Sequence, residues 1–360
     1  MSIDLDMSFQ DGWAALNLEM PDRVPRSEYS AEGHWDLISA VTGTPVSVSS
    51  SDEEKENARK SFVGPDGWNY DFFWSTLIGR GEFGEHRTSM GHAVYAAGGV
   101  DWNPDVFSPY EDPEDVLSFD PMERLGRKDP LQLRNRFEEH YAANARRNPT
   151  GVAMTGVYVT CISGMIDLFG WEMLLLAAGT DPKRFGQLIE RYGEWIGQYY
   201  DALAAADVAV VMVHDDIVWT SGPFIHPDWY RAYVFPTIKK LLAPVVESGK
   251  RILFTADGNY SEFIDDIADC GVTGFVMEPT TDMASIAERY GKTHAFVGNV
   301  DTRILLRGDR QEIREDVERC MAIGKSCPGF FLAVGNHIPP NTPVDSCLYY
   351  NEIYEKLSRR

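Results

Sequence analysis

Cysteine is scarce in this sequence, and so is any sign of export. The five cysteines stand far apart, from Cys161 to Cys347, and form no Cys-x-x-Cys pair. This spacing argues against a disulfide framework and against a cysteine-rich zinc module. No basic amino terminus leads into an apolar segment, so we expect no signal peptide. Together these absences predict a reduced, cytoplasmic protein.

Positive charge and long apolar runs are also lacking. The net charge is −22 and the isoelectric point is about 4.7. The chain therefore offers no basic face for phosphates, which excludes nucleic acid as a partner. No stretch approaches the ~20 apolar residues that a membrane helix needs, so we expect no membrane span. A phosphate loop of the form Gly-x-x-x-x-Gly-Lys-Ser/Thr is absent too, which disfavours a nucleotide-binding open sheet.

What the chain does have is a regular alternation of strand and helix signals. Apolar or aromatic runs typical of strands fall at 68–74, 151–160, 208–213, 251–255, 274–277, 294–298 and 329–334. Helical patterns fall at 31–42, 51–62, 130–147, 182–205, 227–246, 260–269, 282–290 and 310–323, from residue 171, and from residue 345 to the end. Such alternation predicts parallel strands joined by right-handed crossovers.

The fold class that fits best is α/β, a single (βα)8 TIM barrel that occupies residues 1–360. Residues 1–65 are expected to form a helical extension packed on the barrel, and residues 79–115 a long loop insertion. Seven strands can be placed, and the eighth is expected somewhere in 93–120. A doubly wound open sheet is the alternative fold.

The stretch from Ala206 to Asp216 carries the clearest functional signal. Its apolar run, Val208 to Val213, is typical of a parallel strand buried on both faces, and three ionisable residues follow it directly. In a barrel of this kind the active site lies at the carboxyl ends of the strands. Polar residues follow other strands as well, and those strand-end residues are Cys161, His214, Asp215, Asp216, Asp257, Asn259, Glu278, Asn299, Asp301, Asn336 and His337.

Two kinds of chemistry suit these strand ends. His214, Asp257, Glu278 and His337 could bind a divalent ion through nitrogen and oxygen ligands, which zinc accepts. Alternatively, His214, Asp216, Asp257 and His337 could carry out general acid–base catalysis on a bound substrate. For single residues the ordinary structural roles stay open, because aspartate after a strand is also a common helix cap. Residues expected to line a substrate pocket are Trp74, Tyr158, Trp219, Asn259 and Asn336.

Several longer motifs resemble the uroporphyrinogen decarboxylase superfamily. They are EMPDRVPRSEYS at 19–30, HDDIVWTSGPFIHPDWYRAYVFPTIKKL at 214–241, FVGNVDTRILLRGDRQEIREDVERC at 296–320 and FLAVGNHIPPNTPVDS at 331–346. The resemblance covers most of the chain, is strongest from about residue 150 onward, and implies one (βα)8 barrel.

The resemblance also implies a choice between two activities. True uroporphyrinogen decarboxylases carry an Arg-Gln-Ala-Gly-Arg segment for the substrate carboxylates and an aspartate after the first strand. Here the opening reads Arg23-Val-Pro-Arg26-Ser and the 72–76 stretch reads Phe-Phe-Trp-Ser-Thr, so both motifs are missing. Corrinoid-dependent methyltransferases of the superfamily move a methyl group between a small substrate and the cobalt of a corrinoid protein. Those that methylate coenzyme M bind zinc through His-x-Cys and a later Cys, whereas the matching positions here are Thr255-x-Asp257 and Asn336/His337.

The predicted function is therefore methyl transfer from a small methoxylated substrate, such as an aryl methyl ether, to the cobalt of a corrinoid (cobalamin) carried by a partner protein. A bound Zn²⁺ or a protonated side chain would activate the leaving oxygen. Asp215 or Asp216 is expected to orient a neighbouring ligand, and the 79–115 loop to cap the site or receive the corrinoid protein. Two alternatives stay open: a uroporphyrinogen decarboxylase-type lyase and a non-catalytic barrel that binds a small molecule or corrinoid protein. Family members are often homodimers.

Overall fold

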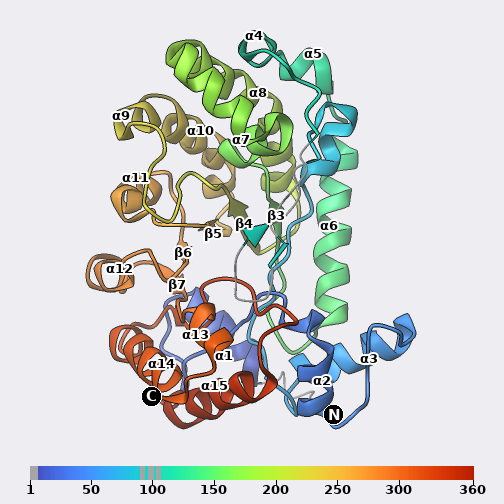
Figure 1. The fold of residues 1–360 in the computed structure, drawn as a ribbon, viewed down its shortest axis with the longest axis vertical. Helices are drawn as coiled ribbons and strands as arrows, with labels where there is room; N and C mark the ends of the chain where they lie inside the picture. Colours follow the sequence, from blue (N-terminus) through green and yellow to red (C-terminus); the bar gives the residue numbers. More distant parts are fainter. Residues whose placement is uncertain (1–6, 90–93, 96–100, 103–106) are drawn as a thin grey trace.

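The computed structural model describes residues 7–89, 94–95, 101–102 and 107–360. Its strands are β1 Val94–Tyr95, β2 Asp101–Trp102, β3 Thr155–Val157, β4 Val210–His214, β5 Arg251–Ala256, β6 Gly274–Met277, β7 Ala295–Val297 and β8 Phe330–Phe331. Strands β3 to β8 form one parallel sheet in sequence order. The helices that connect these strands lie around the outside of the sheet (Figure 1). This arrangement confirms the predicted α/β fold of the (βα)8 barrel type.

The helices fall in three groups along the chain. The first group is α1 Met7–Leu16, η1 Ala31–Gly33, α2 Trp35–Thr42 and α3 Asp52–Val63. The second is η2 Arg80–His86, α4 Pro113–Leu117, α5 Pro121–Leu125 and α6 Pro130–Arg147. The third is α7 Ile162–Thr180, α8 Pro182–Ala205, α9 Pro227–Trp229, η3 Tyr230–Val234, α10 Phe235–Glu247, η4 Ser261–Phe263, α11 Ile264–Asp269, α12 Met283–Tyr290, α13 Thr302–Arg307, α14 Arg310–Gly324 and α15 Val344–Leu357.

Within the described residues the regular sheet has six strands and does not close by itself. Two extended segments bridge the gap between β8 and β3 through a few backbone hydrogen bonds. From β8 the path runs from the Leu332 N–H to the Pro25 carbonyl (2.9 Å), then from the Asp71 N–H to the Arg26 carbonyl (2.9 Å). It ends at the Val152 N–H, which donates to the Asp71 carbonyl (2.8 Å) just before β3. Pro25 has no N–H to donate, so this segment cannot form a regular ladder.

Two sequence predictions about the strands differ from the structure. Residues 68–74 form no regular strand and contribute a single bridge, from Phe72 to Val152. Among the described residues of 93–120, β1 and β2 pair with each other, antiparallel, and no strand joins the main sheet. The segment around Arg26 takes the place of the predicted eighth strand instead.

Helix α7 begins at Ile162, about one helical turn past β3, and not at Trp171 as predicted. By length and composition this helix passes the test for a membrane span, against the expectation from the sequence. Its apolar window is 67% buried inside the protein, and Gly170 breaks its helical geometry with φ 75°. Both features are typical of a core helix that packs against a sheet and its neighbours.

Successive side chains of each strand belong to two different cores. Val210, Met212, Leu253 and Val276 join an inner cluster, together with Leu16 from α1. The residues between them along the strands, such as Val211, Val213 and Phe254, join the larger cluster shared with the helices. This alternation follows from the two-residue period of a strand. The same alternation decides which residues at the end of each strand lie on the inner face of the barrel.

A buried ion pair holds the first closing segment in place. Arg26 and Glu28 are 0% and 3% exposed and lie 3.0 Å apart (Nη2 to Oε1). The Arg26 guanidinium lies over the rings of Trp68 and Tyr354 at 4.5 and 4.4 Å. Glu28 also accepts from the Val334 N–H at 2.9 Å. The pair therefore ties the opening segment both to the last strand and to α15.

We predict that Glu28→Gln lowers the free energy of unfolding by about 3–5 kcal/mol, because it leaves the Arg26 charge buried without its partner. Chemical denaturation followed by circular dichroism measures this. The control is Asp269→Ala, which removes an exposed pair with Lys239 and should change the value by less than about 1 kcal/mol. Equal effects of the two substitutions would contradict the clamp role of Glu28.

Candidate functional site

His214 is the last residue of β4 and lies on the inner face of the barrel. It continues the inner row of Val210 and Met212 by strand alternation. The side chain is 3% exposed and its ring stacks on Tyr158, with centroids 3.8 Å apart and planes 10° apart. Its Nδ1 lies 3.0 Å from the Tyr158 carbonyl oxygen. A carbonyl only accepts, so Nδ1 carries a hydrogen and Nε2 faces the barrel mouth.

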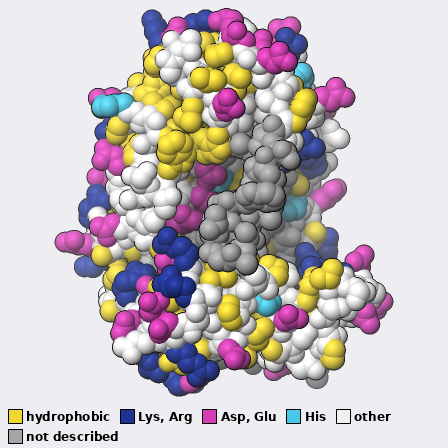
Figure 2. Space-filling view, viewed as in Figure 1, with side chains coloured by type: hydrophobic (Ala, Val, Ile, Leu, Met, Phe, Trp, Pro, Cys, Tyr) yellow, Lys and Arg dark blue, Asp and Glu magenta, His cyan; other side chains and the backbone are white. Residues whose placement is uncertain are grey.

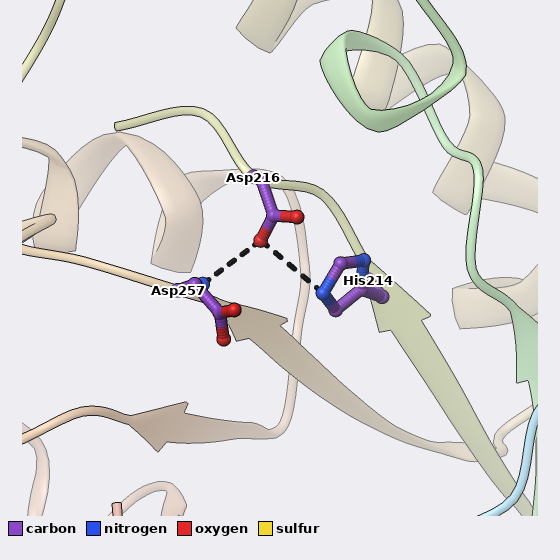
Figure 3. Close-up of side chains that lie close together, drawn as sticks. All are labelled: His214, Asp216 and Asp257. Atoms are coloured by element: carbon purple, nitrogen blue, oxygen red, sulfur yellow. Dashed lines mark hydrogen bonds and ion pairs between the residues drawn. The ribbon is translucent and has the colours of Figure 1, made fainter. Parts of the chain in front are cut away.

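Two carboxylates meet the Nε2 side of this ring (Figure 3). Asp216 Oδ1 lies 3.2 Å from His214 Nε2 and accepts the Asp257 backbone N–H at 2.9 Å. Asp257 follows β5, whose Thr255 pairs with His214 across the sheet. One ligand atom from each of the three side chains lies within 4.8 Å of the others. We call His214, Asp216 and Asp257 the mouth cluster.

Asp215, between two members of the cluster, faces the opposite way. It is fully buried and accepts the backbone N–H groups of Cys161 (3.1 Å) and Ser163 (2.8 Å), at the start of α7. Burial raises the pKa of Asp215 to about 7, against the lowering effect of these two hydrogen bonds. Ser163 in turn accepts from the Asp216 N–H at 2.8 Å, and its Oγ lies 3.3 Å from His214 Nδ1. Asp215 therefore anchors the start of α7, and Ser163 connects this anchor to Asp216 and His214.

The charge of His214 is controlled by its two acidic neighbours. Burial lowers the pKa of the imidazole, but the Asp216 carboxylate and the Asp257 carboxylate outweigh it, and the pKa rises to about 9. Without a metal ion, His214 is therefore an imidazolium at neutral pH, paired with Asp216. In this state it is a positioned acid whose proton lies at the mouth of the barrel.

The mouth cluster also fits a divalent ion. His214 offers Nε2 with its Nδ1–H held by a backbone carbonyl, the arrangement common for metal-binding histidines. Two carboxylates complete a set of three protein ligands. Three nitrogen and oxygen ligands with an open fourth position are typical of catalytic zinc. Asp216 belongs to this group although it was not in the predicted metal set.

Glu278 and His337, the other predicted metal ligands, lie outside the three-residue cluster. Glu278 Oε2 accepts the Gly258 N–H at 2.7 Å, and its Oε1 accepts from Asn336 Nδ2. His337 Nδ1 pairs with the hydroxyl of Ser30. Within the described part of the chain, the predicted four-ligand set is therefore not gathered around one point. Glu278 instead links the loop after β5 to the segment after β8.

The predicted pocket residues lie in three different settings. Tyr158 covers the inner face of the His214 ring. Trp74 packs against the inner cluster and stacks on Tyr29 at 4.4 Å. Asn259 accepts the Ser261 N–H at 3.0 Å, which is the capping role of a turn residue. The structure therefore brings Tyr158 to the cluster, whereas Asn259 shapes the loop that carries Asp257.

Trp219 is 42% exposed and belongs to an aromatic group on the rim. Its ring lies 5.7 Å from Trp171 and 5.3 Å from Phe224. We call these three residues the aromatic rim. Figure 2 shows hydrophobic side chains gathered next to acidic ones near the middle of this face. Exposed apolar groups of this kind commonly mark binding surfaces.

Two residues at the site were missed from the sequence, Ser163 and Tyr29. Ser163 lies in the first turn of α7, in a stretch that the sequence pattern assigns to a Gly-flanked turn, and only its tertiary contact with Asp215 indicates a role. Tyr29 lies in the opening segment, whose prolines and arginines hide any strand pattern. The motif at 19–30 was noticed, but nothing in one sequence places it beside β8.

Comparison with known proteins shows the family of the chain. The sequence profile described as "Uroporphyrinogen decarboxylase (URO-D)" matches residues 90–356. The chain belongs to this family. The family match confirms the resemblance seen in the motifs at 214–241, 296–320 and 331–346.

Individual relatives of the family are distant. Uroporphyrinogen decarboxylase of Chromohalobacter salexigens is 25% identical over 185 residues, which are 50% of each chain. That of Coxiella burnetii is 26% identical over 182 residues, 49% of this chain and 48% of the relative. The chain thus spans about half the length of these relatives. A methyltransferase from Methanosarcina mazei has a similar structure, with a TM-score of 0.63 and 18% identity over 98% of this chain and 99% of that one.

We predict that the purified protein binds one Zn²⁺ at the mouth cluster and that affinity rises with pH. Binding at Nε2 displaces the proton that His214 carries below pH about 9. The apparent dissociation constant should therefore fall roughly tenfold per pH unit between pH 6 and 8, with one proton released per ion. Isothermal titration calorimetry in buffers of different ionisation enthalpy measures both quantities.

The matched control uses a second His-x-Asp pair, His226 and Asp228, which is highly exposed on the surface. Asp216→Asn should weaken Zn²⁺ binding by at least about tenfold, whereas Asp228→Asn should leave it unchanged. Zinc that binds equally well to both variants would show that the mouth cluster is not the metal site.

Proposed function

We propose that this protein is a methyltransferase that moves a methyl group from a small methoxylated compound, such as an aryl methyl ether, to a corrinoid carried by a partner protein. The observation that carries the proposal is the mouth cluster, an acid–base or metal-binding group at the carboxyl ends of β4 and β5. Demethylation of an ether needs a group that acts on a poor leaving oxygen, and this cluster can supply one.

Each residue of the mouth cluster would have its own role in the reaction. Asp216 holds His214 through Nε2 and is itself held by the Asp257 N–H and the Ser163 hydroxyl. Asp257 is exposed at the mouth, where a substrate oxygen would arrive. A divalent ion held by the three side chains would supply Lewis-acid activation of that oxygen. Without an ion, the His214 proton would serve the same oxygen through general acid catalysis.

The absence of thiol ligands bears on the type of methyl donor. The three candidate ligands are one nitrogen and two carboxylates, whereas thiolates are the softer ligands. All five cysteines are buried and unpaired, away from the three-residue cluster. A site of hard ligands suits oxygen substrates better than thiols, which supports an ether as the methyl donor. The Methanosarcina mazei neighbour shares the fold and is described as a methyltransferase, which is consistent with this proposal.

Decarboxylation of a porphyrinogen is the second candidate, favoured by the names of the distant relatives. Such a substrate carries many carboxylates and would need accessible arginines. The two arginines of the opening motif are already used in the fold, since Arg23 pairs with Asp71 and Arg26 with Glu28. Both Asp71 and Glu28 are buried. This engagement weighs against the decarboxylase candidate.

A non-catalytic barrel that binds a small molecule or corrinoid protein is the third candidate. Against this third candidate, a buried histidine meets two carboxylates at one point, and groups whose pKa is shifted by such neighbours concentrate at functional sites. The aromatic rim beside the cluster would receive the corrinoid protein, because its exposed apolar surface lies where the cofactor must enter. We also propose that this reaction takes place in the cytoplasm, where corrinoid proteins and reduced cysteines are both found.

The test is methyl transfer from methoxyarenes to free cob(I)alamin, followed by absorbance and by release of the demethylated product. His214→Gln and Asp257→Asn should each lower kcat/KM by roughly 10²–10⁴-fold. His226→Gln, an exposed histidine on the same connection, is the control and should be fully active. Turnover of uroporphyrinogen without methyl transfer from any ether would overturn the proposal in favour of the second candidate.

A further inference from the structure

Tyr29 is held at the barrel mouth by its backbone and by its ring. Its carbonyl accepts the Ile338 N–H at 3.0 Å, and it forms a parallel bridge with His337. The ring stacks on Trp74, with centroids 4.4 Å apart and planes 17° apart. Both rings pack against the inner cluster of the barrel. The position of Tyr29 is therefore fixed by three independent contacts, none of which uses its hydroxyl.

The hydroxyl of Tyr29 is buried and has no hydrogen-bond partner among the described residues. A buried polar group without a partner usually costs about 1–3 kcal/mol, and proteins keep few of them. Two more buried polar atoms in that part of the structure share this property, Trp74 Nε1 and Thr255 Oγ1. Thr255 lies two residues after Leu253 of the inner cluster, so it too faces the interior. Near the mouth, the inner wall of the barrel therefore carries three buried hydrogen-bond donors without a partner among the described residues.

The electrostatic surroundings keep the Tyr29 hydroxyl protonated. Burial, together with the nearby carboxylates of Asp257 and Glu278, raises its pKa well above its usual value of 10. A hydroxyl in this state only donates or accepts hydrogen bonds and does not ionise at neutral pH. The backbone bridge between Tyr29 and His337, which follows β8, places Tyr29 at the edge of the barrel where the strands end.

We propose that Tyr29 is a further catalytic residue whose hydroxyl donates a hydrogen bond to the oxygen of the bound methyl donor. This inference rests on the proposed methyl transfer and names the group that contacts the leaving oxygen. When the C–O bond breaks, its electron pair stays on that oxygen, and a fixed donor stabilises the growing negative charge. The hydrogen bond strengthens as the charge develops, so it acts on the reaction more than on binding of the neutral ether.

The first experiment is Tyr29→Phe, with methyl transfer to free cob(I)alamin as the assay. The phenyl ring keeps the stacking on Trp74 and the backbone contacts, so the thermal midpoint should stay within a few degrees. We expect kcat to fall by roughly 10²–10³-fold, as for the loss of one oxyanion donor, with KM changed less than about threefold. Tyr290→Phe is the control, because its hydroxyl bonds Asp265 on the outer face.

A series of ethers with different leaving groups separates a catalytic role from a structural one. Methoxyarenes whose phenols are more acidic need less stabilisation of the leaving oxygen. The defect of Tyr29→Phe should therefore shrink steadily from methoxybenzene to 4-nitromethoxybenzene. A defect of the same size for every donor, or unchanged kcat, would overturn the role of Tyr29 while leaving the methyl transfer proposal intact.

A binding measurement covers the case in which the wild-type protein transfers no methyl group. The phenolate of 4-nitrophenol represents the demethylated product, and its binding is followed by absorbance at pH 8. Tyr29→Phe should weaken it at least about fivefold, and Tyr290→Phe should leave it unchanged. Equal binding to the wild type and Tyr29→Phe would refute the hydrogen bond, whatever reaction the barrel catalyses.

Discussion

The backbone hydrogen bonds that close the ring between β8 and β3 are the constraint on which the rest of the structure depends. They pass through Pro25, Arg26 and Asp71, which belong to no regular strand. Because the ladder is irregular, side chains supply much of the fixation, through the Arg26–Glu28 pair and the rings around it. The same segment then carries Tyr29 up to the mouth. One short stretch of chain, residues 25–29, therefore both helps to close the fold and contributes a residue to the candidate site.

The mouth cluster depends on the regular side of the barrel. Strands β4 and β5 are paired over five residues, from Val210 with Arg251 to His214 with Thr255. This register brings the residues beyond the two strand ends together without any loop rearrangement. The positive charge on His214 and the negative charge on Asp216 stabilise one another in a place that excludes most water.

The sequence was enough to predict the regular part of the fold and three members of the site. Strands β3 to β8 carry strong apolar runs, and the residues after β4 and β5 were placed at the mouth because parallel strands end at a common edge. The closing segments could not be predicted, because their structure depends on contacts over long sequence distances, such as Arg26 with Leu332. The grouping of Asp216 with His214, and the separation of His337 from them, likewise depend on loop geometry that has no local signal. The part of the 79–115 insertion from 90 to 93, 96 to 100 and 103 to 106 lies outside the described residues.

Asp215 and Asp216 face opposite ways, so two neighbouring residues serve two separate purposes, one in the fold and one in the candidate site. Asp215 holds the start of α7 from the outer side of the strand, and Asp216 contacts His214 at the mouth of the barrel. Substitutions at position 216 can therefore alter the ligand set while the helix stays anchored, whereas substitutions at 215 would disturb the scaffold first. During evolution, the carboxylate at position 216 could be replaced by a thiol or an amide while every variant along the way still folds. The side chain at position 216 can change while the fold that Asp215 anchors stays the same, so one barrel can host several kinds of site.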